Sequence, residues 1–270
     1  MGQIYHSVND SAILGLKTGH ALASAQNINH IVTEATVGDF DICRLKIREG
    51  DKAEVFAALT QAGIDWHHVY DIVKYYPITG NFPPNMPLTK GLSFELYTGE
   101  NADTLVELIK QSYADDPIGY YLSPQLAQYV SKEQEAHCLA MYLSKEFVGP
   151  NYRLWIIKMH GQPVGFTANR IDFTTKEYEG LHAGILPQHR NAGIFASLIR
   201  FNINYSQTIG IIANPTGTRS HNRASQRVFE GEGITTTGTE AIVHLMPLLA
   251  IKKDKLVEAS TNSKVHVLGR

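Results

Sequence analysis

The sequence predicts an α/β protein with two domains, and three features of the chain support this prediction. The residues before position 77 contain a strand-helix-strand unit. Four prolines and two glycines fall within residues 77–91, a composition that favours a linker over a regular element. Beyond this stretch, segments with strand and helix periodicity alternate. We therefore expect a small N-terminal α/β domain over 1–76, a linker over 77–91, a second domain over 92–248 and a polar tail over 249–270.

The elements of the first domain follow from periodicity and from capping residues. Cys43, Leu45 and Ile47 alternate with polar residues, as in a half-buried strand. Asp51 precedes a helical pattern that ends at Gly63, and these residue types are typical of the two caps of a helix. We expect a helix over 11–25, a strand over 40–47, a helix over 52–62 and a strand over 65–75.

The second domain is expected to contain more elements in a similar alternation. Its apolar residues recur at strand spacing in some segments and at helix spacing in others. We expect a strand over 92–97, helices over 103–113 and 122–147, strands over 153–159, 164–171 and 177–186, a helix over 194–206, a strand over 210–214, a helix over 222–232, and strands up to 246.

Composition excludes several classes of protein. The formal net charge of −2 argues against a nonspecific nucleic-acid binder, because such proteins have an excess of basic residues. No apolar run approaches the roughly 18–20 residues that span a bilayer, and the N-terminus lacks the regions of a signal peptide. We therefore expect a cytoplasmic protein with no nucleic-acid or membrane partner. Cys43 and Cys138 are expected in the core, and the scattered histidines indicate no metal site.

The most informative segment is the junction between the strand that ends near Leu186 and the helix that begins at Ile194. The loop between them contains Arg190 and Gly193. The first N–H groups of a helix have no internal partner and lie at the positive end of the helix dipole, so the loop could bind an anion such as a pyrophosphate. The alternative is an ordinary strand-turn-helix with a surface arginine. The common nucleotide-binding fingerprints do not occur in the chain.

This junction resembles the coenzyme A loop of the GNAT superfamily of N-acyltransferases, V-x-P-x-x-R-G-x-G-x-G. Four residues fall on the positions of that motif: Ile185, Pro187, Arg190 and Gly193. Asn191 and Phe195 stand where the motif has glycines. Asn191 is a mild change, because asparagine tolerates left-handed backbone, whereas Phe195 occupies a position at which the cofactor approaches the helix closely.

A second segment, 222–234, resembles the downstream GNAT motif N-x-x-A-x-x-x-Y-E-x-x-G-F. Asn222 and Gly233 match it, and Phe229 stands in the tyrosine position. The order of the elements over 92–248 is also that of the GNAT fold, so the resemblance implies an α+β domain with a mixed sheet. The topology of the first domain is similar to that of the N-terminal domain in dTDP-fucosamine acetyltransferases, whose second domain is a GNAT domain.

The resemblance implies acetyl-CoA or another acyl-CoA as a co-substrate. Its pantetheine arm would run between two splayed strands, and its pyrophosphate would bind the amides that follow Arg190. The residues implied to bind it are Ala183, Ile185, Arg190, Asn191, Ala192, Gly193, Ile194, Phe195 and Asn222.

The implied reaction is attack of an amine on a thioester, which requires a base, an oxyanion donor and a proton for the thiolate. Glu179 is our choice of base, because it lies on the same face as Ile185 in a regular strand; the alternative is a solvated carboxylate. His182 would then lie on the opposite face, with a structural role. Phe229 cannot supply a proton. His221 or Tyr205 could replace it, the thiolate could leave unaided, or the activity could be lost.

The acceptor is expected to be a small amine that binds near the first two helices of the second domain. Asp115, Tyr120 and Tyr121 supply carboxylate and aromatic groups there, although the same segment could be a turn with surface tyrosines. The two-domain resemblance favours a nucleotide-linked amino sugar. Three alternatives stay open: an acyl carrier protein as donor, an amino acid as acceptor, and a module that binds a CoA ester without turnover. A homodimer also stays open.

Overall fold

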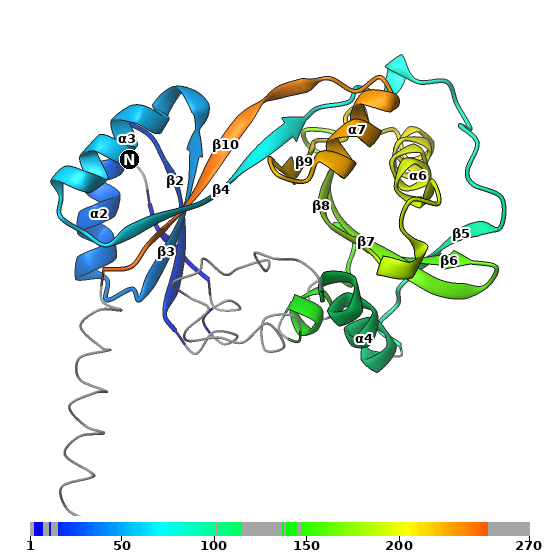
Figure 1. Ribbon diagram of the computed structural model, residues 1–270, viewed down its shortest axis with the longest axis horizontal. Helices are drawn as coiled ribbons and strands as arrows, with labels where there is room; N and C mark the ends of the chain where they lie inside the picture. Colours follow the sequence, from blue (N-terminus) through cyan, green and yellow to red (C-terminus); the bar gives the residue numbers. More distant parts are fainter. Residues whose placement is uncertain are drawn as a thin grey trace, which may run out of the picture. The chain divides into compact units, whose positions relative to one another are not determined.

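The computed structural model describes residues 3–7, 11, 16–100, 102–114, 137, 139–144 and 147–247 (Figure 1). The chain forms two compact units. The first comprises Met1–Asp71 and Glu240–Arg270, and the second comprises Ile72–Thr239. This division differs from the expected one at both boundaries: the first boundary falls inside a strand, ahead of residues 77–91, and the chain returns to the first unit at Glu240.

In the first unit, two helices pack against a sheet and form the core with it. Strand β2 pairs in parallel with β3, and β3 pairs antiparallel with residues 240–245 of β10. Buried residues of these strands pack against Ile31, Val55 and Leu59 of the two helices. Its described elements are β1 (Tyr5–His6), β2 (Thr18–Ala23), α2 (Ile28–Val37), β3 (Ile42–Arg48), η1 (Glu49–Asp51), α3 (Lys52–Gln61) and parts of β4 (Trp66–Tyr75) and β10 (Thr236–Leu245).

The expected helix over 11–25 is wrong over Thr18–Ala23, which is a strand. Thr18, Ala21 and Ala23 are buried, and the strand pairs with β1 and β3. Small apolar residues in a short run fit either period, and here strand pairing outweighs the helix propensity of alanine. Cys43 is confirmed as a core residue: burial, with a smaller contribution from the nearby Glu34 carboxylate, raises the pKa of its thiol to about 12.

The second unit is built on an antiparallel sheet in the order β5-β6-β7-β8. Figure 1 shows α4 on one face of this sheet and α6 with α7 on the other, and two separate apolar clusters fill these faces. Its elements are η2 (Thr79–Asn81), β5 (Leu92–Leu96), α4 (Ala102–Tyr113), β6 (Tyr152–Met159), β7 (Gln162–Asp172), β8 (Glu177–Ile185), η4 (Pro187–His189), α6 (Ile194–Thr208), β9 (Thr216–Arg219) and α7 (Arg223–Gly231).

Two expected elements of this unit need comment. Residues 137 and 139–144 of the expected helix over 122–147 are helical, and most of the remainder, with Cys138, lies outside the described residues. The expected strand over 210–214 is wrong, because the strand β9 begins at Thr216. Residues 210–214 are held instead by isolated contacts, including single bridges from Ala213 to Ile78 and to Glu177. The apolar run is too short to distinguish these two arrangements.

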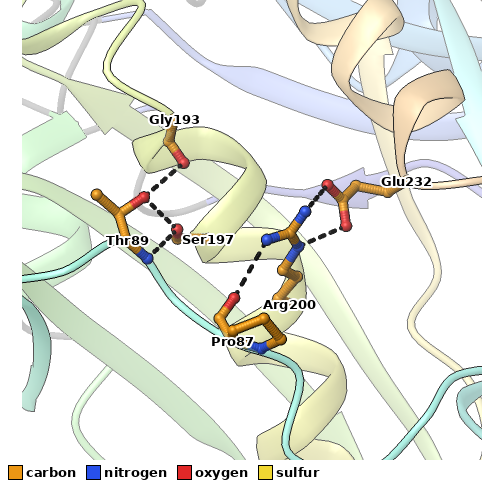
Figure 2. A network of polar contacts seen from close by, with 6 residues as sticks. All are labelled: Pro87, Thr89, Gly193, Ser197, Arg200 and Glu232. Atoms are coloured by element: carbon orange, nitrogen blue, oxygen red, sulfur yellow. Dashed lines mark hydrogen bonds and ion pairs between the residues drawn. The ribbon is translucent and has the colours of Figure 1, made fainter.

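Residues 77–91, which we call the strap, lie along helix α6 within the second unit (Figure 2). The side chain of Asn204 bonds to both backbone groups of Met86, at 2.9 Å each. At the end of the strap, the amide of Thr89 donates to Ser197 Oγ at 2.9 Å, and the Thr89 hydroxyl lies 3.5 Å from Gly193 O. The proline-rich composition thus produces an extended segment fixed by side chains of a helix.

Arg200 joins the strap, α6 and the end of α7, and its loss is expected to destabilise the second unit. Its guanidinium donates two bonds to the Glu232 carboxylate, at 2.8 and 2.7 Å, and a third to Pro87 O at 3.2 Å (Figure 2).

Because the Glu232 side chain is only 12% exposed, Arg200→Met should lower the free energy of unfolding by about 1–3 kcal/mol. Lys158→Met breaks a more exposed ion pair with Glu95 and should cost less than about 1 kcal/mol. Urea denaturation of both variants checks this, and equal losses would contradict it.

Candidate active site

One edge of strand β8 is covered only along its first half. Tyr178 N–H donates to Ala213 O and Gly180 N–H donates to Pro215 O, both at 2.9 Å. Beyond this point β9 pairs with β4, and in the described part of the chain no hydrogen bond joins β9 to residues 181–185. The sheet therefore opens beside the second half of β8.

The backbone groups of Ala183 and Ile185 point into this opening. Leu186 N–H donates to Val164 O at 2.9 Å, which makes the next residue pair along the ladder, Gly165 and Ile185, a pair without mutual hydrogen bonds. The same alternation applies to Ala183. The N–H and C=O groups of Ala183 and Ile185 therefore point away from β7, toward the uncovered edge.

The loop after β8 ends at the N-terminus of helix α6, where the described residues offer no acceptor to the first amides. Asn191 and Gly193 have positive φ values of 63° and 72°, and Gly193 is the N-cap of α6 without a side-chain cap. Within the described residues, none of the amides of 191–196 donates to a protein acceptor. Asn191, Ala192 and Gly193 are exposed, so N–H groups at the positive end of the helix lie in a loop that a ligand can reach.

Arg190 joins the loop to α4. Its Nε donates to Ile185 O at 3.1 Å, and its Nη2 donates to Ser112 O at 2.9 Å. Ser112 is 4% exposed and lies directly against Gly184: a Cβ added at Gly184 would come within 2.6 Å of Ser112 Cβ. The side chain of Arg190 thus fixes the end of α4 on β8, in addition to placing positive charge near the loop.

The aromatic departures from the two motifs, Phe229 and Phe195, pack against each other, with Phe229 in the core and Phe195 partly buried beside it. Phe229 is 3% exposed and stacks on Tyr75, with ring centroids 4.2 Å apart. Phe195 packs edge-on against Phe229 at 5.6 Å. Asn222, which the resemblance implies to contact the cofactor, caps α7 through a bond from Ser225 N–H to its Oδ1 at 3.2 Å.

A β-bulge in β8 changes the expected positions of the two candidate bases. Ala168 pairs with His182, but Asn169 pairs with Gly180, so Leu181 is the extra residue. Because one extra residue reverses the alternation of faces, Glu179 lies on the opposite face from Ile185 and on the same face as His182. The expectation that Glu179 shares the face of Ile185 is wrong.

The environments of these two side chains differ. Glu179 forms an ion pair with Arg170 at 2.6 Å. His182 is half-buried, and the ring of Phe147 lies edge-on to it at 6.3 Å. The shared face is that of α4, because the neighbouring β7 residues Phe166 and Ala168 belong to the apolar cluster that includes α4.

Other side chains considered from the sequence are distributed as follows. Tyr205 Oη accepts a bond from Arg153 Nε at 2.9 Å, and its ring packs against Trp155. His221 is exposed in the turn after β9. The three residues expected to bind the acceptor, Asp115, Tyr120 and Tyr121, lie outside the described residues.

Sequence reasoning missed the role of Tyr113, the last residue of α4. Its hydroxyl donates to Ala183 O at 3.1 Å, at the uncovered edge of β8. Its ring lies edge-on to Phe166 at 6.1 Å. In the sequence it is one of several tyrosines, and only the contact of α4 with β8 distinguishes it. Among the described residues, no group of acidic, histidine and cysteine side chains could hold a metal ion, and no helix is long and apolar enough to cross a membrane.

No protein-family model matches the sequence, and no curated protein matches it. Solved structures do match the chain. A GCN5-related N-acetyltransferase from Sphaerobacter thermophilus is 10% identical, with 91% of this chain and 76% of that chain covered and a TM-score of 0.60. This chain has the GNAT fold.

Two further solved structures of GNAT proteins also match the chain. A GCN5-related N-acetyltransferase from Kribbella flavida is 14% identical, with 87% of this chain and 83% of that chain covered and a TM-score of 0.53. A putative GNAT acetyltransferase from Novosphingobium aromaticivorans is also 14% identical, with 84% of each chain covered and a TM-score of 0.53. The expected fold class, a mixed α/β architecture of the GNAT type, is confirmed, whereas identities this low say nothing about the substrate.

Proposed function

We propose that the protein is an acyl-CoA-dependent N-acyltransferase that acts on a small amine. The observation that supports this best is the order of two sets of amides along the chain. The amides of Ala183 and Ile185 face the edge of β8 away from β7, and those of 191–196, which follow them, donate to no acceptor within the described residues. A pantetheine arm needs backbone partners along one strand, and a pyrophosphate needs converging N–H groups. The two sets of amides lie at successive positions of the same strand-loop-helix segment, in the order that coenzyme A requires.

In this proposal, the thioester lies near Ala183, and a β8 amide at the uncovered edge donates to the tetrahedral oxyanion. The amine approaches from the α4 face. It has to lose a proton before attack, because a protonated amine has no lone pair. We assign the base to His182, a half-buried side chain of this face next to Ala183, because histidine is the most frequent general base in enzymes.

The assignment of the base predicts a clear difference between two variants. His182→Gln should lower the single-turnover rate of acyl transfer by about 100-fold, because general base catalysis contributes about that much. Glu179→Gln should change the same rate by less than about threefold, since its carboxylate is paired with Arg170. Rapid-quench measurement of both variants at saturating amine checks the order. A large fall in the rate for Glu179→Gln with little change for His182→Gln would show that Glu179 is the base instead.

The donor and acceptor are proposed more narrowly from the two-domain resemblance: acetyl-CoA, and a nucleotide-linked amino sugar. An acyl carrier protein as donor or an amino acid as acceptor uses the same site. The non-catalytic alternative, a module that only holds a CoA ester, is favoured by one observation: the buried Phe229 has no hydroxyl at the tyrosine position of the motif.

Release of free thiol distinguishes these possibilities. The full chain is mixed with acetyl-CoA and a panel of amines that includes amino sugars, nucleotide-linked amino sugars and amino acids. The proposal predicts amine-dependent thiol release by at least one member of the panel. Binding of acetyl-CoA without thiol release for any amine or acyl donor would favour the module, and the absence of binding would contradict the proposed function.

A further inference from the structure

Release of the thiolate needs a proton donor that the downstream motif does not provide here. Phe229 has no acidic proton and is buried against Tyr75. Tyr205 is a tyrosine on α6, but its hydroxyl bonds to Arg153 and its ring packs in the cluster around Trp155. Neither side chain presents a hydroxyl at the uncovered edge of β8.

Tyr113 does present one there. Its Oη lies 3.1 Å from Ala183 O, on an edge where no strand among the described residues is hydrogen-bonded to 181–185. Its position is fixed by three contacts at the end of α4: its own bond to Ala183, the bond from Arg190 to Ser112 O, and the packing of Ser112 on Gly184. The Tyr113 phenol is therefore held against β8 by the end of α4 and by the loop that carries Arg190.

The direction of the cofactor places the sulfur near this hydroxyl. If the pyrophosphate binds at 191–196, the pantetheine arm runs back along β8 and passes Ile185 before Ala183. The thioester end of the arm is then the part that reaches Ala183, where the Tyr113 hydroxyl lies. This step depends on the proposed function, since it takes the binding direction from it.

We propose that Tyr113 is the general acid that protonates the departing thiolate. The amine nitrogen forms a bond to the thioester carbon, and the carbon–sulfur bond breaks with its electron pair passing to sulfur. The base takes the proton that the amine nitrogen loses and releases it to water. The Tyr113 O–H bond breaks, its proton passes to sulfur to give the free thiol, and the phenolate regains a proton from water, so one proton is released and one is taken up. The products are an amide and coenzyme A, and no further reactant is needed.

The test compares Tyr113→Phe with Tyr205→Phe in the full chain. Each variant removes one phenolic hydroxyl and keeps the ring. Tyr113→Phe should lower the single-turnover rate by about 100-fold, with the Kd for coenzyme A and the melting temperature close to those of the unchanged protein. Tyr205→Phe should keep a rate within about threefold of the unchanged protein.

Three other outcomes would contradict either the role of Tyr113 or the proposed function. An unchanged rate in Tyr113→Phe overturns the inference and leaves the proposed function intact. A fall in rate that is matched by equal losses of coenzyme A affinity and thermal stability also overturns it, because the hydroxyl would then only support the backbone of β8. If the unchanged protein transfers no acyl group from any donor to any amine, the proposed function itself fails.

Discussion

Gly184→Ala is expected to lower both the stability and the acyl-transfer rate of the protein, because the end of α4 packs directly on this position. A Cβ at residue 184 would lie 2.6 Å from Ser112 Cβ and 2.6 Å from a ring carbon of Phe166. Neither group can move without disturbing the buried cluster around α4. Overpacking of this kind typically costs about 1–3 kcal/mol of the free energy of unfolding.

The displaced helix end should also move Tyr113 away from Ala183, so the single-turnover rate should fall by at least about tenfold. Urea denaturation and rapid-quench kinetics measure the two effects. Gly80→Ala, in the strap, is the matched control, since a Cβ there would meet no atom within 4 Å. It should change stability by less than about 0.5 kcal/mol. A Gly184→Ala protein that is as stable and active as this control would contradict the described packing.

Ala192→Glu is expected to weaken the binding of coenzyme A by at least about tenfold. Ala192 is exposed in the loop whose amides donate to no acceptor in the described part of the chain, so a carboxylate there would repel the pyrophosphate without disturbing the core. The glutamine of Ala192→Gln is nearly the same size as the glutamate and carries no charge, so this variant should change the Kd for coenzyme A by less than about threefold. Isothermal titration with coenzyme A measures both variants.

Salt provides a further check on this prediction. The difference in affinity between Ala192→Glu and Ala192→Gln should shrink as the ionic strength increases, because charges at an exposed loop are screened. The melting temperatures of the two proteins without ligand should agree. Equal affinities for coenzyme A in the two variants would exclude this loop as the pyrophosphate site.

Local signals in the sequence are sufficient to predict the strand-loop-helix segment that forms the candidate site. The left-handed conformation of Gly193, the start of α6 and the end of β8 all follow from residues within ten positions of each other. The same holds for α7, where Asn222 is the N-cap. Both motifs encode backbone geometry that depends little on the rest of the chain.

The parts that were not predictable depend on contacts between distant segments. The bulge at Leu181 arises from the pairing of β8 with β7, and it moves Glu179 to the face of His182. The only local signal is the adjacent Gly180, because a glycine inside a strand often marks a bulge but does not locate the extra residue. The strand character of Thr18–Ala23 likewise depends on its partners β1 and β3. Tyr113 becomes a candidate only because its hydroxyl bonds to Ala183 O, 70 residues away in the sequence.

The account depends on one claim, that the amides beside the sheet opening and at the start of α6 bind coenzyme A. Backbone amide chemical shifts, recorded by NMR as unlabelled coenzyme A is added to the ¹⁵N-labelled protein, test this claim most directly. The account predicts that Ala183, Ile185 and residues 191–196 show the largest changes, with saturation at a single site. Unchanged resonances for these residues at saturating coenzyme A, with or without changes elsewhere, would contradict it.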